Sequence, residues 1–186
     1  MPQPWTRPAT AADAPRIARI HVDSWRETYT GLIPDELIAA RTIEARLETW
    51  TRAARAVEGG GPHRLVVGGL GEAGRDGDAI LGFAYAGPPA PAAVPGEPEP
   101  GRELGEELWT LYCLRAGQGV GLGSALLAAA LPPGPAFCWA LSTNAPALAF
   151  YRARAFEPEA PPVTRGSAEP LDVRLVRPAA ETEIRR

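Results

Sequence analysis

The sequence predicts one α/β domain built on a mixed β-sheet, and three observations lead to this class. Strand-like and helix-like segments alternate across residues 107–154, an order that implies parallel strands joined by right-handed crossovers. Two strand-like segments, 63–68 and 79–85, flank a glycine- and aspartate-rich stretch and predict an antiparallel pair. The 186 residues, 45% of them hydrophobic, suffice for one core. We place the domain at 1–178 and a frayed tail at 179–186.

The amino-terminal half opens with a short strand around residues 5–7. Thr10 and Asp13 have the spacing of a capping box, which predicts a helix directly after them. The apolar face of this helix comprises Ile17, Ile20, Val22 and Trp25. Pro34 suits the first turn of a second helix, whose apolar positions continue to Trp50 at approximately helical spacing.

The carboxy-terminal half begins after a segment, 87–105, that is dominated by proline, glycine, alanine and glutamate. Such a composition cannot build a packed core, so we predict an extended, mobile loop. The elements expected after it are a strand at 107–114, a helix at 124–131, a strand at 137–142, a helix at 146–154 and a last strand at 171–176.

The most informative feature is the glycine-dense turn between the strand at 107–114 and the helix at 124–131. Glycine accepts backbone angles that other residues avoid, so consecutive N–H groups can turn toward one point. The glycines concerned are Gly117, Gly119, Gly121 and Gly123. The helix start adds unpaired donors and the positive end of a macrodipole. The turn therefore predicts a site for an anion such as a diphosphate.

Two common phosphate loops do not fit this turn. A Walker loop needs a lysine before its Ser or Thr, whereas Gly123 precedes Ser124 and the chain contains no lysine. A dinucleotide fingerprint needs a sixth-position glycine, and that position is Leu122 or Ser124, depending on the frame. A protein that binds ATP through the turn is the weakest alternative, and calorimetry comparing coenzyme A with ATP distinguishes it.

The pattern Gln118-x-x-Gly121-x-Gly123 resembles the coenzyme A pyrophosphate loop of the GNAT superfamily, the Gcn5-related N-acetyltransferases. The segment from Asn144 is similar to the superfamily signature N-x-x-A-x-x-F-Y-x-x-x-G-F, with matches at Ala147, Phe150, Tyr151 and Phe156. The amino terminus also looks like that of a GNAT protein, at Arg7–Asp13 and Trp25–Leu32.

This resemblance implies a sheet of six to seven strands, about four flanking helices, and parallel fourth and fifth strands that splay apart. It implies an enzyme that transfers an acyl group, most simply acetyl from acetyl-CoA, directly to a primary amine in a ternary complex. It places a general acid at Tyr151 and a base at Glu107, and it pairs the main chain of Leu111, Tyr112 and Cys113 with the pantetheine arm. The implied coenzyme contacts are Gln118, Gly119, Val120, Gly121, Leu122, Gly123, Ser124, Asn144 and Tyr151.

Each of these roles has a structural alternative. Tyr151, a phenol with an ordinary pKa of about 10, stays protonated at neutral pH and can donate to a thiolate, but it could also be a core residue. We expect Phe150 to anchor the helix and free Tyr151. Glu107 could be a solvated charge at a loop end, and Asn144 could cap a helix. Cys113 is a poor nucleophile because burial in an apolar strand raises a thiol pKa.

The acceptor amine, small or peptidic, is expected to lie against Trp25 and Tyr29, and nearby glutamates favour a cationic amine. Three departures from the family pattern bear on the match, and one of them is Arg115, which takes the place of a frequent proline. Val120 stands where an arginine is common, which removes a charged phosphate contact. Ala155 replaces the usual glycine before Phe156, and a left-handed alanine costs roughly 1–2 kcal/mol. A silent acyl-CoA sensor of the same fold is therefore the alternative function.

Bulk composition excludes several other classes. A net charge of −3 and a pI near 5.5 argue against nucleic acid as the main partner. Two cysteines and the absence of a long apolar stretch predict a cytoplasmic protein without a membrane span. Two histidines give little support for a metal site, so we expect no metal cofactor. The acyl chain length, and the choice between monomer and homodimer, stay open.

Overall fold

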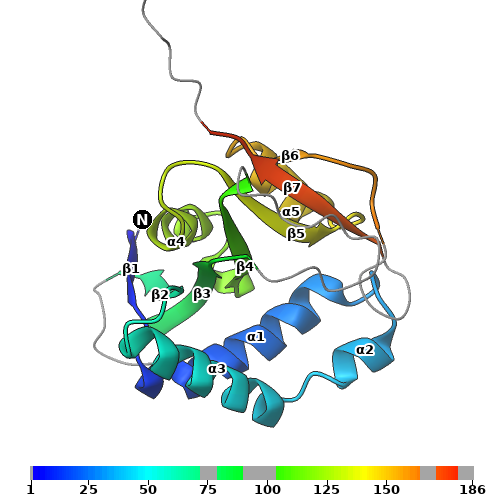
Figure 1. Cartoon of the computed structure of the whole chain (residues 1–186). Helices are drawn as coiled ribbons and strands as arrows, with labels where there is room; N and C mark the ends of the chain where they lie inside the picture. The colour runs from blue at the N-terminus through cyan, green and yellow to red at the C-terminus, as the bar shows by residue number, and fades with distance from the viewer. Residues whose placement is uncertain (1, 72–78, 90–103, 164–170, 180–186) are drawn as a thin grey trace, which may run out of the picture. The chain divides into compact units, whose positions relative to one another are not determined.

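The computed structural model describes residues 2–71, 79–89, 104–163 and 171–179. These residues form seven strands and five α-helices, together with short 3-10 turns (Figure 1). In chain order the elements are β1 (Pro4–Pro8), α1 (Ala14–Tyr29), α2 (Asp35–Ala39), α3 (Ile43–Glu58), β2 (Arg64–Leu70), β3 (Ile80–Gly87), β4 (Glu106–Cys113), α4 (Leu122–Ala130), β5 (Ala136–Leu141), α5 (Ala145–Arg152), β6 (Glu157–Pro158) and β7 (Asp172–Arg177).

The seven strands form one mixed sheet in the order β1-β2-β3-β4-β5-β7-β6. Strands β4 and β5 run parallel, whereas the pairs β1/β2, β2/β3, β5/β7 and β6/β7 are antiparallel. This arrangement confirms the predicted α/β class, the strand number and the parallel pair.

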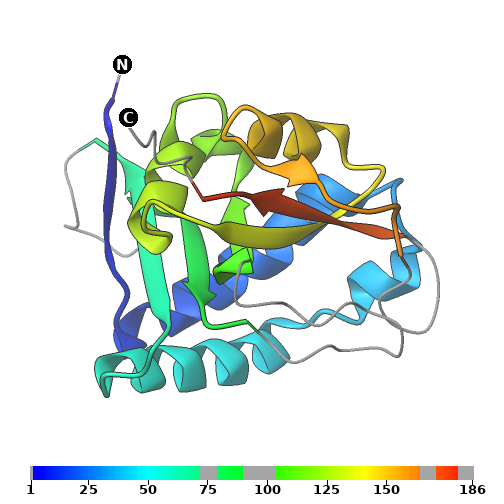
Figure 2. The same cartoon turned by 45° about the horizontal axis from the view of Figure 1, so that its top comes forward.

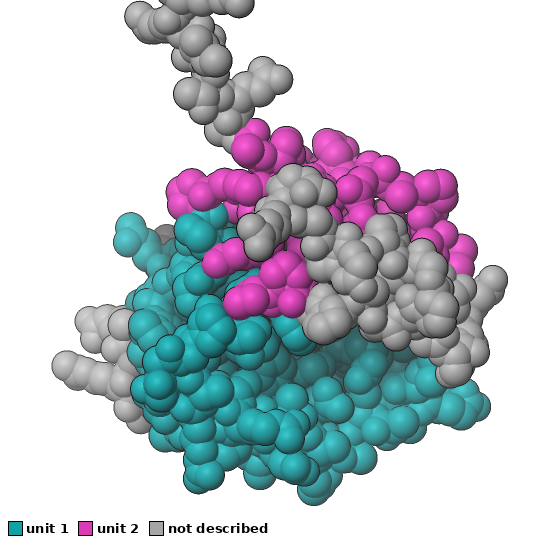
Figure 3. All heavy atoms as spheres, in the orientation of Figure 1, with its two compact units in different colours: residues 1–87, 109–132 teal, residues 88–108, 133–186 magenta. Residues whose placement is uncertain are grey.

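The chain divides into two compact units, 1–87 with 109–132 and 88–108 with 133–186 (Figure 3). The boundary falls inside β4, between Leu108 and Trp109. The assignment of one domain to 1–178, and the splaying of β4 from β5, stay predictions.

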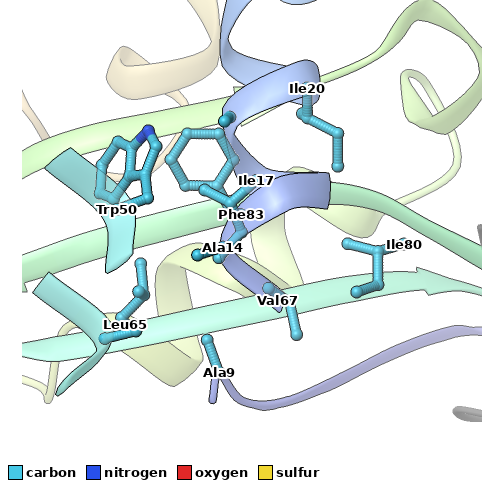
Figure 4. Close-up of a cluster of buried hydrophobic side chains, with 11 residues drawn as sticks. Ala9, Ala14, Ile17, Ile20, Trp50, Leu65, Val67, Ile80 and Phe83 are labelled. Atoms are coloured by element: carbon cyan, nitrogen blue, oxygen red, sulfur yellow. The ribbon is translucent and has the colours of Figure 1, made fainter. Parts of the chain in front are cut away.

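The first unit places α1 and α3 on one face of its strands and α4 on the other (Figures 1 and 2). Alternation along β2 explains this, because neighbouring side chains point to opposite faces. Val67 joins the core between the sheet, α1 and α3, where Ile17, Trp50 and Phe83 are almost fully buried (Figure 4). On the opposite face Gly68 lets α4 approach closely, since a Cβ there would lie 3.2 Å from Leu126.

The predicted capping box before the first helix is confirmed. The main-chain N–H of Thr10 donates to Asp13 Oδ2 at 2.8 Å. Arg7 also donates to both oxygens of this carboxylate, at 2.7 and 2.8 Å. The carboxylate of Asp13 therefore ties β1 to the start of α1.

The single helix predicted from Pro34 to Trp50 is wrong, because the structure contains two helices, α2 and α3, over this stretch. Thr42 is the N-cap of α3 and separates the two helices. Its backbone is extended, and its hydroxyl accepts a hydrogen bond from Ala45 N at 3.3 Å. A threonine whose hydroxyl bonds to a nearby main-chain N–H favours the extended N-cap conformation over a position inside a helix. This break also explains why five helices form where about four were expected.

The second unit contains β5, β6, β7 and α5, together with the first residues of β4. The parallel register pairs Glu107 with Phe137 and Leu108 with Cys138. Helix α5 ends at Arg152, and the chain then turns through Ala155, whose φ of 61° is left-handed. The substitution of alanine for glycine therefore leaves the left-handed turn in place.

Several predicted features lie outside the described residues. They are most of the loop at 87–105, most of the tail at 179–186 and the connection between β2 and β3 at 72–78. Within the described ranges, none of the helices is long and apolar enough to cross a bilayer.

His21 is a buried polar residue at the centre of the first unit. Its Nδ1 accepts a hydrogen bond from Trp50 Nε1 at 3.1 Å, which joins α1 to α3. Burial, together with the charges of Arg46 and Arg41, lowers the pKa of His21 from 6.5 to about 3. The imidazole is therefore neutral in the folded protein at neutral pH.

We predict that replacing Ala155 by glycine raises the free energy of unfolding by about 0.5–1 kcal/mol. Glycine removes the left-handed strain of roughly 1–2 kcal/mol. Part of this stabilisation is lost because glycine also raises the conformational entropy of the unfolded chain. Ala153→Gly is the matched control, because Ala153 has right-handed helical angles and glycine there should destabilise. Urea unfolding of both variants measures the difference, and equal effects would contradict the prediction.

We predict that acid destabilises the protein through His21. The pKa of His21 is near 6.5 in the unfolded chain and about 3 in the folded protein, so between these values only the unfolded chain binds the proton. The free energy of unfolding therefore falls as the pH drops through this window. The loss between pH 7 and pH 5 should be about 2 kcal/mol. His21→Asn keeps an acceptor for Trp50 and removes the titration, so its urea midpoint should fall less steeply over the same pH range. An unchanged slope would show that other groups dominate.

Candidate functional site

The glycine turn predicted to hold an anion lies in the first unit, between β4 and α4. Gly119 and Gly121 have left-handed φ values of 72° and 89°, and both are exposed. The other two glycines of the turn do not have left-handed angles. Gly117 is buried, where a Cβ would lie 2.8 Å from Leu122, and Gly123 lies within α4. Two glycines shape the turn, a third allows close packing, and the fourth is an ordinary helix position.

Helix α4 begins at this turn, with Gly121 as its N-cap. The first bond of the helix runs from Ala125 N to Gly121 O at 3.1 Å. Helical geometry therefore leaves the N–H groups of Leu122 and Gly123 without acceptors inside the helix. These groups, and the positive end of the helix dipole, face the exposed turn, so the residues present fit an anionic ligand.

Gln118 makes hydrogen bonds within the protein, and its predicted coenzyme contact stays a prediction. Its side-chain amide donates to the main-chain oxygen of Cys113 at 2.9 Å, and its own N–H donates to Arg115 O at 3.1 Å. Both bonds hold the turn against the end of β4. Main-chain donors of α4 are then the main groups for an anion, since Val120 carries no charge.

The end of β4 carries the predicted main-chain contacts, Leu111, Tyr112 and Cys113, all of them partly buried. Tyr112 also belongs to an aromatic group with the predicted acceptor residues. The ring centroids of Trp25 and Tyr29 are 4.6 Å apart, and Trp25 Nε1 donates to the Tyr112 hydroxyl at 2.6 Å. A further side-chain hydrogen bond joins Tyr112 to Tyr29. The first unit thus brings these three aromatic side chains together.

The second unit brings together Glu107, Cys138 and Tyr151. Tyr151 on α5 is hydrogen-bonded to the thiol of Cys138 on β5, and the charge of Glu107 on β4 acts on the same thiol. The parallel register explains the contact, because Cys138 pairs with the residue that follows Glu107. Sequence reasoning missed Cys138, although the offset of the parallel strands would have indicated it.

Burial decides between the alternatives left open for these residues. Glu107 is only 6% exposed, so it is not a solvated loop-end charge. Tyr151 is 8% exposed, whereas Phe150 is partly exposed under the guanidinium of Arg154, 3.8 Å above its ring. The expectation that Phe150 anchors α5 and frees Tyr151 is therefore wrong. Tyr151 packs edge-on against Phe156, with 5.7 Å between the ring centroids.

Asn144 caps α5, as its structural alternative predicted. Its Oδ1 accepts a hydrogen bond from Ala147 N at 3.2 Å, and the residue is 6% exposed. The predicted coenzyme contact at Asn144 stays a prediction. The candidate residues of the second unit are thus Glu107, Asn144 and Tyr151, and the remaining ones belong to the first unit.

Neither cysteine is an activated nucleophile. Burial raises the pKa of Cys113 to about 12. Burial also raises the pKa of Cys138, and the nearby Glu107 carboxylate adds to the rise, while the hydrogen bond with Tyr151 opposes it. Both thiols therefore stay protonated at neutral pH. Among the described residues, no group of histidine, cysteine, aspartate and glutamate side chains could hold a metal ion.

Comparisons with known proteins connect this geometry to an enzyme class. The chain is 31% identical over 159 residues to YuaI of Bacillus subtilis strain 168, an uncharacterized N-acetyltransferase, and the match covers 82% of this chain and 79% of that protein. No family model matches the chain.

Solved structures share the fold over nearly the whole chain. The PaiA N-acetyltransferase of Thermoplasma acidophilum, in complex with coenzyme A, superposes with a TM-score of 0.66 at 15% identity, covering 95% of this chain and 99% of that one. YncA of Salmonella typhimurium, a putative acetyltransferase with its cofactor acetyl-CoA, gives a TM-score of 0.57 at 21% identity, covering 94% and 92%.

We predict opposite effects for alanine at two glycines of the turn. Gly121→Ala should lower the free energy of unfolding by about 1–2 kcal/mol, because φ at this position is left-handed. Gly123→Ala should raise it by a few tenths of a kcal/mol, because Gly123 has helical angles in the first turn of α4 and alanine has the higher helix propensity. Thermal or urea unfolding of the two variants measures both changes. An equal loss of unfolding free energy in both variants would contradict the prediction.

Proposed function

Because the chain belongs to the GNAT superfamily and is a GNAT-type N-acetyltransferase, we propose that it transfers acetyl from acetyl-CoA directly to a primary amine in a ternary complex. The observation that carries this proposal is the exposed turn at the start of α4, where left-handed Gly119 and Gly121 precede the first-turn main-chain N–H groups of the helix. Relatives of the same fold, PaiA and YncA, were solved with coenzyme A and acetyl-CoA.

The turn holds the diphosphate of the coenzyme through main-chain N–H groups. The donors are those of Leu122 and Gly123, with the helix dipole adding to the attraction. Leu111, Tyr112 and Cys113 of β4 offer main-chain groups to the pantetheine arm. Because Val120 supplies no positive charge, the affinity depends on backbone geometry more than on side chains.

The reaction needs a neutral amine and a proton for the leaving group. The amine nitrogen attacks the thioester carbonyl, a C–N bond forms, the C–S bond breaks, and the nitrogen loses a proton while the departing sulfur gains one. Glu107 takes the proton from the incoming ammonium, directly or through water. Tyr151 donates a proton to the coenzyme A thiolate.

Two observations support this assignment of roles. Glu107 and Tyr151 both interact with Cys138, so a carboxylate and a phenol lie near one thiol in the second unit. Both cysteines keep raised pKa values, which disfavours an acyl-cysteine intermediate and favours direct transfer.

We predict that Tyr151→Phe lowers kcat about a hundredfold or more, because the ring stays and only the proton donor is lost. The measurement is release of the coenzyme A thiol over a panel of amines. Cys138→Ala is the matched control: it removes the partner of the tyrosine hydroxyl but leaves the hydroxyl itself, so kcat should change only a few-fold. Glu107→Gln should abolish the rise of kcat/KM with pH that the base produces.

If Tyr151→Phe and Cys138→Ala lowered kcat equally, the role of the Tyr151 hydroxyl would be structural. Tight binding of acetyl-CoA by the wild type without turnover of any amine would favour the silent acyl-CoA sensor. Circular dichroism and thermal unfolding of each variant separate a chemical effect from a folding defect.

A further inference from the structure

Two arginines beside the aromatic group of the first unit have no carboxylate partner within the described ranges. Arg41 follows α2, and Arg46 lies near the start of α3. The ion pairs in the described part of the chain involve other arginines, at positions 7, 26, 152 and 174. The Nε atoms of Arg41 and Arg46 are buried and make no hydrogen bond.

The Arg41 guanidinium stacks on an aromatic residue predicted to contact the acceptor, and the charge of Arg46 acts on Arg41. The central carbon of the Arg41 guanidinium lies 3.3 Å from the centroid of the Trp25 ring. The charges of Arg46 and Arg41 both act on His21, one helical turn before Trp25. We refer to Trp25, Tyr29, Tyr112, Arg41 and Arg46 as the arginine–aromatic cluster.

The cluster concentrates positive charge without an internal counter-charge. Burial lowers the pKa of Arg41, the charge of Arg46 lowers it further, and Tyr112 and Tyr29 oppose this. No carboxylate is among the groups that shift it. His21 is neutral, so it adds no charge of its own. Two like charges held close together disfavour the folded state unless an anion joins them.

Both arginines are only partly exposed, with covered Nε atoms, so the rest of each side chain keeps some contact with solvent. A guanidinium presents a planar fork of N–H donors that matches the two oxygens of a carboxylate or the oxygens of a phosphate. The stacking of Arg41 on Trp25 restricts this fork before any ligand binds.

We propose that the acceptor amine also carries an anionic oxyacid group, a carboxylate or phosphate, which binds Arg41 and Arg46 beside Trp25 and Tyr29. This inference rests on the proposed function, since it takes the arginine–aromatic cluster as part of the acceptor site. The glutamates in the sequence suggested a purely cationic amine as acceptor. The proposal favours instead an acceptor that carries both an amine and an acidic group, such as an amino acid or an amino phosphate.

The test compares each acidic amine with a neutral analogue. Phenylalanine is paired with phenylalaninamide, and phosphoethanolamine with ethanolamine, and kcat/KM is measured by release of the coenzyme A thiol. We expect the acidic member of one pair to be favoured about tenfold or more, and the pair that shows the preference separates carboxylate from phosphate recognition.

The variants locate this preference in the two arginines. Arg41→Gln and Arg46→Gln should each reduce this preference about tenfold, through the KM of the acidic amine. Arg41→Lys keeps the charge and should restore only part of it, because lysine lacks the fork. Arg52→Gln, the same charge change at an exposed position of α3, is the matched control and should have no effect.

Equal kcat/KM for both members of each pair, or a preference that survives both glutamine variants, would overturn the inference while acetyl transfer itself stands. Calorimetry with N-acetylphenylalanine and its amide gives a readout that needs no turnover. Tighter binding of the acid, lost in Arg41→Gln, supports the inference even if no amine is acetylated. Equal binding of acid and amide contradicts it.

Discussion

The first unit depends on a histidine that must stay neutral. His21 accepts the Trp50 indole N–H at Nδ1, which requires a lone pair on that nitrogen, and this bond fixes α3 against α1. Burial and the neighbouring arginines keep the proton off the ring. One turn further along α1, Trp25 donates to Tyr112 on β4. The same helix face therefore supplies both the core of the unit and the aromatic wall of the candidate acceptor site.

The second unit uses burial in a comparable way. Glu107 and Tyr151 come from β4 and α5, and both interact with Cys138 on β5, although only the first two were singled out for chemistry. The Glu107 carboxylate is only 6% exposed, and its charge adds to the rise of the Cys138 pKa. Tyr151 is buried because its ring packs against Phe156. The left-handed turn at Ala155 comes directly before Phe156 in the chain.

Sequence patterns predicted most of the fold because they reflect local rules. The capping box at Thr10, the parallel pair β4/β5 and the order of strands and helices all follow from spacing and chain order. The break at Thr42 was missed, because its hydroxyl cap competes with an apolar pattern that runs through it. The glycine turn was found, but its mechanism was overstated: φ values separate Gly119 and Gly121 from Gly117, whose role is close packing.

The sequence alone determined the class of the fold and the position of the anion turn, since glycine spacing and helix starts are local properties. It also identified Glu107 and Tyr151 as candidates for proton transfer. Only the tertiary structure placed both beside Cys138, buried Tyr151 rather than Phe150, and brought Arg41 to the aromatic residues of α1 and β4 with the charge of Arg46 acting on it. Those outcomes depend on which elements pack together, because burial and charge proximity are properties of the assembled chain and not of its local pattern.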